Sequence, residues 1–219
     1  MRFAHWFKGV LPTAVAFGLF TFLLGGCPSK PTDPTSQNIN TFQHAHQQVT
    51  DAREQVGKTL AALDKYCKTP ALSSYDEFSN SVAELDHIAY GIRDTAARMK
   101  EDGDLYFQSW DAELAAMTNA DLKKASSAQK AGVQAAYKEV SAKAPDVRNA
   151  YNKFMDDCTN LKTYFDRDKS PSGVASASTL ISTTNADGAE LQRQLDQEAA
   201  NLNNVKNLFS QMKMGAEQK

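Results

Sequence analysis

The sequence predicts an all-α fold: an elongated antiparallel up-down bundle of about four long helices with coiled-coil-like packing. Hydrophobic residues recur at alternating steps of three and four along most of the chain, which is the period of one helix face. Glycine and proline are scarce beyond residue 34, and Ala, Gln, Asn, Lys, Asp and Glu dominate there. This composition favours helix over sheet.

The N-terminal segment has the layout of a secretory signal peptide. Arg2 and Lys8 supply positive charge, residues 10–24 carry no charged side chain, and Leu24-Gly25-Gly26-Cys27 follows at once. These four residues resemble the lipobox of bacterial lipoproteins, in which a Leu and two small residues precede the Cys. The resemblance implies that a signal peptidase removes residues 1–26 and that Cys27 is acylated on its sulfur and on its new amine.

Two alternatives for this segment are a permanent membrane anchor and an ordinary signal peptide that leaves Cys27 as a free thiol. The apolar run of 15 residues is shorter than the roughly 20 residues of a spanning helix. Three acyl chains on Cys27 provide stable attachment, whereas one chain binds only marginally. Lipoproteins retained in the inner membrane commonly have Asp after the Cys, and here Pro28 follows. Attachment to the outer membrane, facing the periplasm, is therefore expected.

The remaining chain is expected to contain three parts. Residues 27–39 comprise the lipidated Cys and a Pro-rich tether that cannot pack a core. Residues 40–213 form the helical bundle domain, and residues 214–219 form a flexible tail. Without residues 1–26, 22 basic residues oppose 26 acidic ones, a formal net charge of −4. No basic surplus exists, so a nucleic-acid partner is not expected.

The first two helices are predicted over residues 40–67 and 75–117. The first ends before Thr69-Pro70, because the residue before a proline avoids the helical region. The second has a regular heptad pattern: Tyr75, Phe78, Val82, Leu85, Ala89, Ile92, Ala96 and Met99. Asp102-Gly103-Asp104 is a break by composition, yet the pattern continues to Met117. A single helix, kinked or straight at Gly103, is favoured.

The last two helices are predicted over residues 122–165 and 174–212. Pro145 lies inside the apolar pattern of the third helix, so it is read as a kink and not as an end. Asn119 or Thr118 is expected to cap this helix. Residues 169–173 form the strongest internal turn. Residues 185–188, which end at Gly188, are the weak point of the fourth helix.

The segment from Leu105 to Leu114 resembles a bacterial family of unknown function. Members of that family are secreted, helical, predicted coiled-coil proteins with a similar Tyr-Phe-x-x-Trp-x-x-x-Leu segment, then a Ser-rich helix and an aromatic stretch like residues 154–165. The similarity covers roughly residues 40–210. These motifs specify packing, and the family has no established activity, so the resemblance implies a fold and leaves the function open.

Few residues form a pattern typical of catalysis or metal binding. His44 and His46 are two positions apart, which separates them by about 200° around a helix, whereas a helical metal site needs a spacing of four; His87 stands alone. Asp156-Asp157 and Asp166-Arg167-Asp168 are interpreted as solvated helix faces. No nucleophile elbow, phosphate loop or dinucleotide fingerprint occurs. We therefore expect no enzyme activity, no metal and no cofactor.

Three neighbouring aromatic residues could form a ligand platform. Tyr106 and Trp110 fall in the heptad phase, so core packing is the preferred interpretation for both. Phe107 lies just off that phase and is the better candidate for an exposed contact.

Cys67 and Cys158 are an even pair once Cys27 carries lipid, in a compartment that favours disulfides. If each predicted helix folds back on its neighbour at the turn between them, the two cysteines are offset along the bundle axis by about five residues, or 7–8 Å. Both positions also fit the apolar pattern, where a free thiol behaves as a small core residue. A disulfide and two buried thiols both remain open.

These features predict a structural or interaction protein, a scaffold or adaptor for another envelope component. The alternative is a carrier that opens its bundle around an apolar ligand or lipid, with Gly103, Pro145 and Gly188 as hinge points. The sequence identifies no partner beyond the membrane and an envelope protein.

Overall fold

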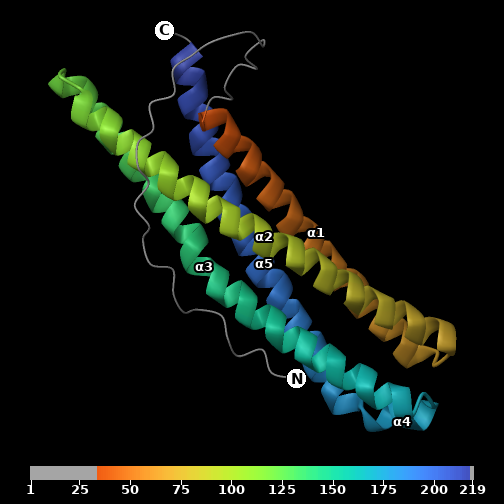
Figure 1. Cartoon of the computed structure of the whole chain (residues 1–219). Helices are drawn as coiled ribbons and strands as arrows, with labels where there is room; N and C mark the ends of the chain where they lie inside the picture. Colours follow the sequence, from red (N-terminus) through yellow and green to blue (C-terminus); the bar gives the residue numbers. More distant parts are fainter. Residues whose placement is uncertain (1–33, 218–219) are drawn as a thin grey trace, which may run out of the picture. The chain divides into compact units, whose positions relative to one another are not determined.

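A computed structural model describes residues 34–217, which belong to one compact unit. They form four long helices, α1 (Pro34–Lys68), α2 (Leu72–Ala116), α3 (Ala120–Arg167) and α5 (Ser178–Glu217), and one short helix, α4 (Pro171–Ser176) (Figure 1). No strand occurs within these residues, which confirms the all-α prediction. The expected signal peptide, its lipobox Leu24, Gly25 and Gly26, and the lipidation site Cys27 lie outside the described residues.

The helical part is longer at both ends than the sequence predicts. α1 begins at Pro34, so residues 34–39 of the expected tether are helical. A proline fits the first position of a helix, where its missing N–H has no intrahelical partner to lose. Asn38 is buried and Ile39 packs against the core, which explains the extension. α5 runs to Glu217, so most of the expected flexible tail is helical too.

α2 and α3 are continuous, as predicted. α2 passes through Gly103 without a break, and α3 passes through Pro145. Asn119 caps α3, because its side-chain oxygen accepts a hydrogen bond of 3.0 Å from the backbone N–H of Leu122. The fourth predicted helix differs from the expectation. It is divided at Ala177 into α4 and α5, whereas the expected weak point around Gly188 is regular helix.

α1 and α5, the first and last described helices, pack directly against each other. The ring centroids of Phe42 and Phe209 are 5.8 Å apart, and Arg53 donates a hydrogen bond to Asp196. A later residue of α1 thus contacts an earlier residue of α5, so the two helices run in opposite directions. α2 packs on α1 and α3 packs on α5 (Figure 1). The long side chains of each helix fill the resulting core, whose largest fully buried members are Phe42, Tyr66, Phe78, Phe154, Phe165 and Phe209.

α2 and α3 approach each other less closely, and tyrosine side chains span the space between them. The hydroxyl of Tyr75 donates to Asp166 at 2.6 Å, and that of Tyr151 donates to Asp86 at 2.7 Å. The hydroxyl of Tyr137 donates to the backbone oxygen of Met99 at 2.5 Å. Because a phenol is both long and polar, it can join helices whose backbones are too far apart for small residues to meet.

Gly103 and Gly188 lie where neighbouring side chains come closest to the helix backbone. A Cβ at Gly103 would stand 2.6 Å from the hydroxyl oxygen of Tyr137. A Cβ at Gly188 would stand 2.8 Å from Leu60 and 2.9 Å from Phe154. Both distances are shorter than real contacts of a methyl group, so each glycine makes room for a neighbour.

Candidate functional site

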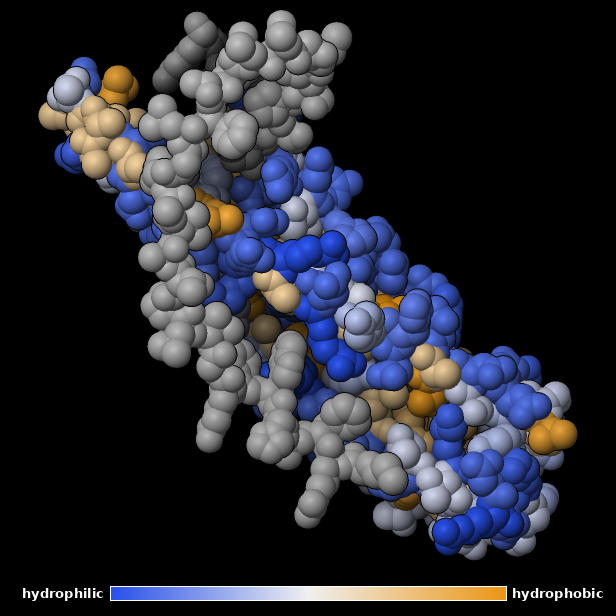
Figure 2. All heavy atoms as spheres, viewed as in Figure 1, coloured by the Kyte–Doolittle hydropathy of each residue, from blue (hydrophilic) through white to orange (hydrophobic). Residues whose placement is uncertain are grey.

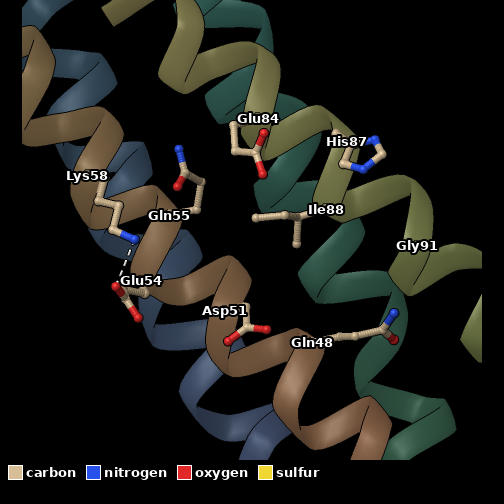
Figure 3. Close-up of a pocket in the computed structure, with 9 residues that line it drawn as sticks. All are labelled: Gln48, Asp51, Glu54, Gln55, Lys58, Glu84, His87, Ile88 and Gly91. Atoms are coloured by element: carbon tan, nitrogen blue, oxygen red, sulfur yellow. Dashed lines mark ion pairs between the residues drawn. The ribbon is translucent and has the colours of Figure 1, made fainter. Parts of the chain in front are cut away.

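A groove of about 420 Å³ lies between α1 and α2 (Figure 3). Its lining residues are Gln48, Asp51, Glu54, Gln55 and Lys58 of α1 with Glu84, His87, Ile88 and Gly91 of α2. Figure 3 shows the side chains of Glu84 and Ile88 extending from α2 toward α1. The absence of a side chain at Gly91 widens the groove there, because a Cβ would stand 3.3 Å from the amide nitrogen of Gln48.

The charges in this groove are solvated. Lys58 donates to Glu54 at 2.8 Å, and both side chains are more than half exposed. This hydrogen bond and the attraction of the two charges lower the pKa of Glu54 and raise the pKa of Lys58. A pair of this kind contributes little to stability because water screens it. The groove is suited to polar or charged contacts, and its walls give an apolar ligand little surface to cover.

The end of the α2–α3 hairpin exposes hydrophobic side chains. Leu105 is 59% exposed and Leu122 is 58% exposed. Most side chains between Asp111 and Gln129 are exposed as well. Figure 2 shows hydrophobic residues gathered at this end of the molecule, over the α2–α3 turn.

The hairpin end is held by contacts between its own two helices. The indole N–H of Trp110 donates to Ser126 at 2.9 Å, and Lys130 pairs with Asp111 at 2.5 Å. The Lys130 side chain is largely buried, which makes this ion pair less screened than those on the surface. The two leucines are therefore presented on a braced helix pair.

The three aromatic residues singled out in the sequence lie together on α2. Tyr106 and Trp110 stack edge to face with centroids 5.6 Å apart, and both contact the core, as expected. Phe107 differs from the expected exposed contact. It is partly buried and meets Tyr137 edge to face at 5.8 Å. The exposed side chain of this segment is Leu105, two positions earlier.

The histidines and acidic pairs take different environments. His44 and His87 are exposed and His46 is half-buried. Asp166 accepts from Tyr75, and Asp168 accepts from the backbone and hydroxyl of Ser170 at the α3–α4 turn. Within residues 34–217, His, Cys, Asp and Glu side chains form no group of three or more that could hold a metal ion.

The structure adds buried acids that the sequence patterns did not reveal. Asp187 and Glu198 of α5 are buried, and one carboxylate oxygen of Asp157 on α3 is buried as well. Asp157 therefore differs from the predicted solvated face. Each of these positions directly precedes or follows a residue of the apolar pattern. α5 packs against both α1 and α3 and therefore buries a wider face than the apolar pattern marks. The sequence pattern alone does not reveal this arrangement.

Cys67 and Cys158 are free thiols in this structure. Cys158 is fully buried among core residues, whereas Cys67 is half-buried at the end of α1. Burial raises the pKa of the Cys158 thiol to about 12 and also raises the pKa of Cys67.

Comparison of the chain with protein-family models, with curated proteins and with solved structures finds no match. The resemblance of residues 105–114 to a secreted helical family accordingly stays a prediction. None of the helices in the described part of the chain combines the length and the apolar character that a membrane span requires.

Proposed function

We propose that this chain is a lipid-anchored scaffold of the bacterial cell envelope, attached to the outer membrane through Cys27 and facing the periplasm. The lipobox resemblance of Leu24 to Cys27 supports the anchor. The four long helices support the scaffold, because 35 to 48 residues in each give lengths of roughly 50–70 Å at 1.5 Å per residue. In this proposal they act as an up-down, coiled-coil-like spacer.

The observation that carries the scaffold proposal is the hairpin end with Leu105 and Leu122. Two large aliphatic side chains, each more than half exposed, stand on a helix pair that is braced by Trp110 and Ser126. Contiguous exposed hydrophobic side chains mark protein contact surfaces, and in this proposal the two leucines belong to one such surface. We infer that this end contacts an envelope protein.

The glycines argue for a scaffold and against a carrier. A carrier was expected to open at Gly103, Pro145 and Gly188. Tyr137 fills the space beside Gly103, and Leu60 and Phe154 fill the space beside Gly188. Most residues that line the described α1–α2 groove are polar or charged. These contacts favour a closed bundle over one that parts around lipid.

Site-specific crosslinking in cells tests the proposal. A photo-reactive amino acid at Leu122 of the full chain should capture one discrete envelope protein. The matched control is Leu72, which is 66% exposed but lies at the opposite end of α2. The same reagent at Leu72 should capture nothing at comparable yield.

Two results would contradict the proposal. Equal capture from both positions would mean that exposure alone produces the crosslinks. Purified full chain that carries stoichiometric lipid in native mass spectrometry, beyond the acyl groups on Cys27, would favour the carrier.

A further inference from the structure

The interface between α3 and α5 contains acids in an otherwise apolar contact. We define the acidic seam as Asp157 of α3 with Asp187 and Glu198 of α5. Asp187 is 8% exposed and Glu198 is 7% exposed. Acids are seldom buried to this extent without a cationic partner, because desolvation strongly disfavours the charged form.

Glu198 lacks a direct cationic partner among the described residues. Its Oε2 atom is buried and receives no hydrogen bond there, and the same holds for Oε1 of Gln194, one turn earlier on α5. Burial raises the pKa of Glu198 to about 7, although a hydrogen bond from Asn201 and the charge of Lys143 oppose the shift. The side chain is therefore placed to hold a proton while α3 and α5 are in contact.

The charged groups around Glu198 are committed to other partners. On α3, Lys143 pairs with Asp146 at 3.1 Å. On α5 itself, Glu190 pairs with Arg193 at 2.7 Å. On α1, Arg53 pairs with Asp196, two positions before Glu198. Ionised Glu198 would have to draw Lys143 away from Asp146 or remain unpaired.

The part of α3 that faces Glu198 has partly buried side chains (Val147, Ala150 and Tyr151) but no fully buried one. Its buried side chains stop at Val140 and resume at Phe154. Pro145 lies between them. Because proline has no N–H, the backbone oxygen of Ser141 receives no bond from position 145, which weakens the helix locally. A change in the contact with α5 therefore acts on a segment of α3 that lacks one backbone hydrogen bond.

Asp157 and Asp187 are the acids at the other end of the seam. Lys153 pairs with one oxygen of Asp187 at 2.9 Å. The other oxygen of Asp187 and one oxygen of Asp157 are both buried without a donor from another residue. Burial and the nearby carboxylate of Asp187 raise the pKa of Asp157.

We propose that the α3–α5 interface is a proton-controlled contact: Glu198 is protonated while the helices are packed, and loss of its proton to water releases the segment around Pro145 from α5. The ion pair between Lys153 of α3 and Asp187 of α5 holds the other end of the seam closed. The proposal stands independently of the scaffold function. It adds a response to the acidity of the surroundings.

The direction of the response follows from linkage. The pKa of Glu198 is raised above its ordinary value of 4.5 when the chain is folded, so the folded chain binds more protons than the unfolded chain between that value and about 7. The contact is strongest below pH 4.5 and weakens as the pH rises through about 7. Mild acid therefore tightens the interface.

Urea unfolding of the full chain between pH 5 and pH 8 tests the proposal with two variants. Glu198→Gln keeps the shape of the protonated side chain, and Glu139→Gln makes the same chemical change at an exposed position of α3. The unfolding constant of the wild type should rise at least about tenfold more over this range than that of Glu198→Gln, because each unit of pKa shift is tenfold. Glu139→Gln should follow the wild type. Equal pH dependence in all three proteins would overturn the proposal.

Two measurements on the wild type need no variant. The carbon-13 signal of the Glu198 carboxyl should titrate with a midpoint near 7, and a midpoint at or below 5 would overturn the proposal. Amide exchange of residues 140–154, corrected for the intrinsic effect of pH, should speed up between pH 6 and pH 8. Exchange of residues 55–66 in α1 should not. Parallel acceleration in both segments would show global unfolding and would equally refute a local release.

Discussion

At the scale of single residues, three glycines in helix interiors have unequal roles. Gly103 and Gly188 each admit a neighbour that a methyl group would displace, whereas Gly132 of α3 has open space around it. A helical glycine normally lowers stability relative to alanine by about 0.5–1 kcal/mol. At the first two positions, close packing outweighs that cost.

Gly188→Ala should destabilise the chain and Gly132→Ala should stabilise it. Both changes gain helix propensity, but only at Gly188 would the new Cβ stand within 3 Å of Leu60 and Phe154. Overpacking of this kind costs about 1–3 kcal/mol, whereas the gain at Gly132 is about 0.5–1 kcal/mol. Denaturant unfolding of both variants against the wild type measures the difference. A stabilised Gly188→Ala would show that the gap between α1, α3 and α5 is larger than described.

The two cysteines should differ in reactivity. In the native full chain at pH 8, an alkylating reagent should label Cys67 at least about tenfold faster than Cys158, because the thiolate reacts and burial suppresses it. In denaturant without reductant, both should be labelled, since both are free thiols in this structure. Peptide mass spectrometry reads the sites. Absence of label from both cysteines in denaturant would establish a disulfide between them.

The apolar pattern predicted the core residues of the helices well, because a helix with one neighbour buries one stripe. Trp110, Cys158 and Leu195 are examples of positions in the pattern that are buried. The pattern missed Asp187, Gln194 and Glu198, since a helix with two neighbours buries positions beside the stripe as well. The tertiary arrangement decides which helix has two neighbours, and the periodicity of the apolar residues does not reveal that arrangement.

At the scale of elements, proline acts differently at the two places where it meets a helix. Pro34 begins α1, a position where a missing backbone N–H costs no intrahelical hydrogen bond. Pro145 lies inside α3, which nevertheless continues to Arg167. The uninterrupted apolar pattern was sufficient to predict that the helix continues through Pro145. The sequence predicts the start of α1 at residue 40 and not at Pro34, because the prolines in this segment favour an extended chain.

Pro145→Ala should raise the melting temperature or leave it nearly unchanged. The substitution restores the backbone donor for Ser141 and removes a ring clash with the preceding turn. A gain of about 1 kcal/mol corresponds to roughly 2–4 °C for a chain of this size. Circular dichroism during heating measures the shift. A large fall would mean that a bend at Pro145 is required for α3 to follow α5.

At the scale of the whole molecule, the sequence predicted the all-helical class, whereas the described residues form five helices because the fourth predicted helix is divided at Ala177. It did not predict which helices form the centre of the bundle. The same apolar patterns are compatible with several packing arrangements of antiparallel helices. The sequence predicted an exposed hydrophobic side chain at Phe107, two positions after the one that the structure exposes. Phe107 packs against Tyr137, and Leu105 is exposed.

Cys27→Ser should block lipidation and processing if the lipobox resemblance is correct. The acylating enzyme requires a thiol, and serine offers none. The variant should remain as a larger precursor that incorporates no labelled palmitate, which gel mobility and metabolic labelling measure. Cys67→Ser is the matched control and should be processed and labelled as the wild type. Normal size and labelling of Cys27→Ser would refute the anchor.

The pairing of α1 with α5 has a consequence for synthesis. α1 and α2 can form a hairpin as soon as both have been made, but α1 cannot meet its other main neighbour until Ser178–Glu217 has been synthesised. Contacts between the two ends of a chain form slowly because they close the longest loop. The bundle therefore cannot close until the 40 residues of α5 are available, and a chain that ends before Ser178 leaves the apolar face of α1 without its main cover.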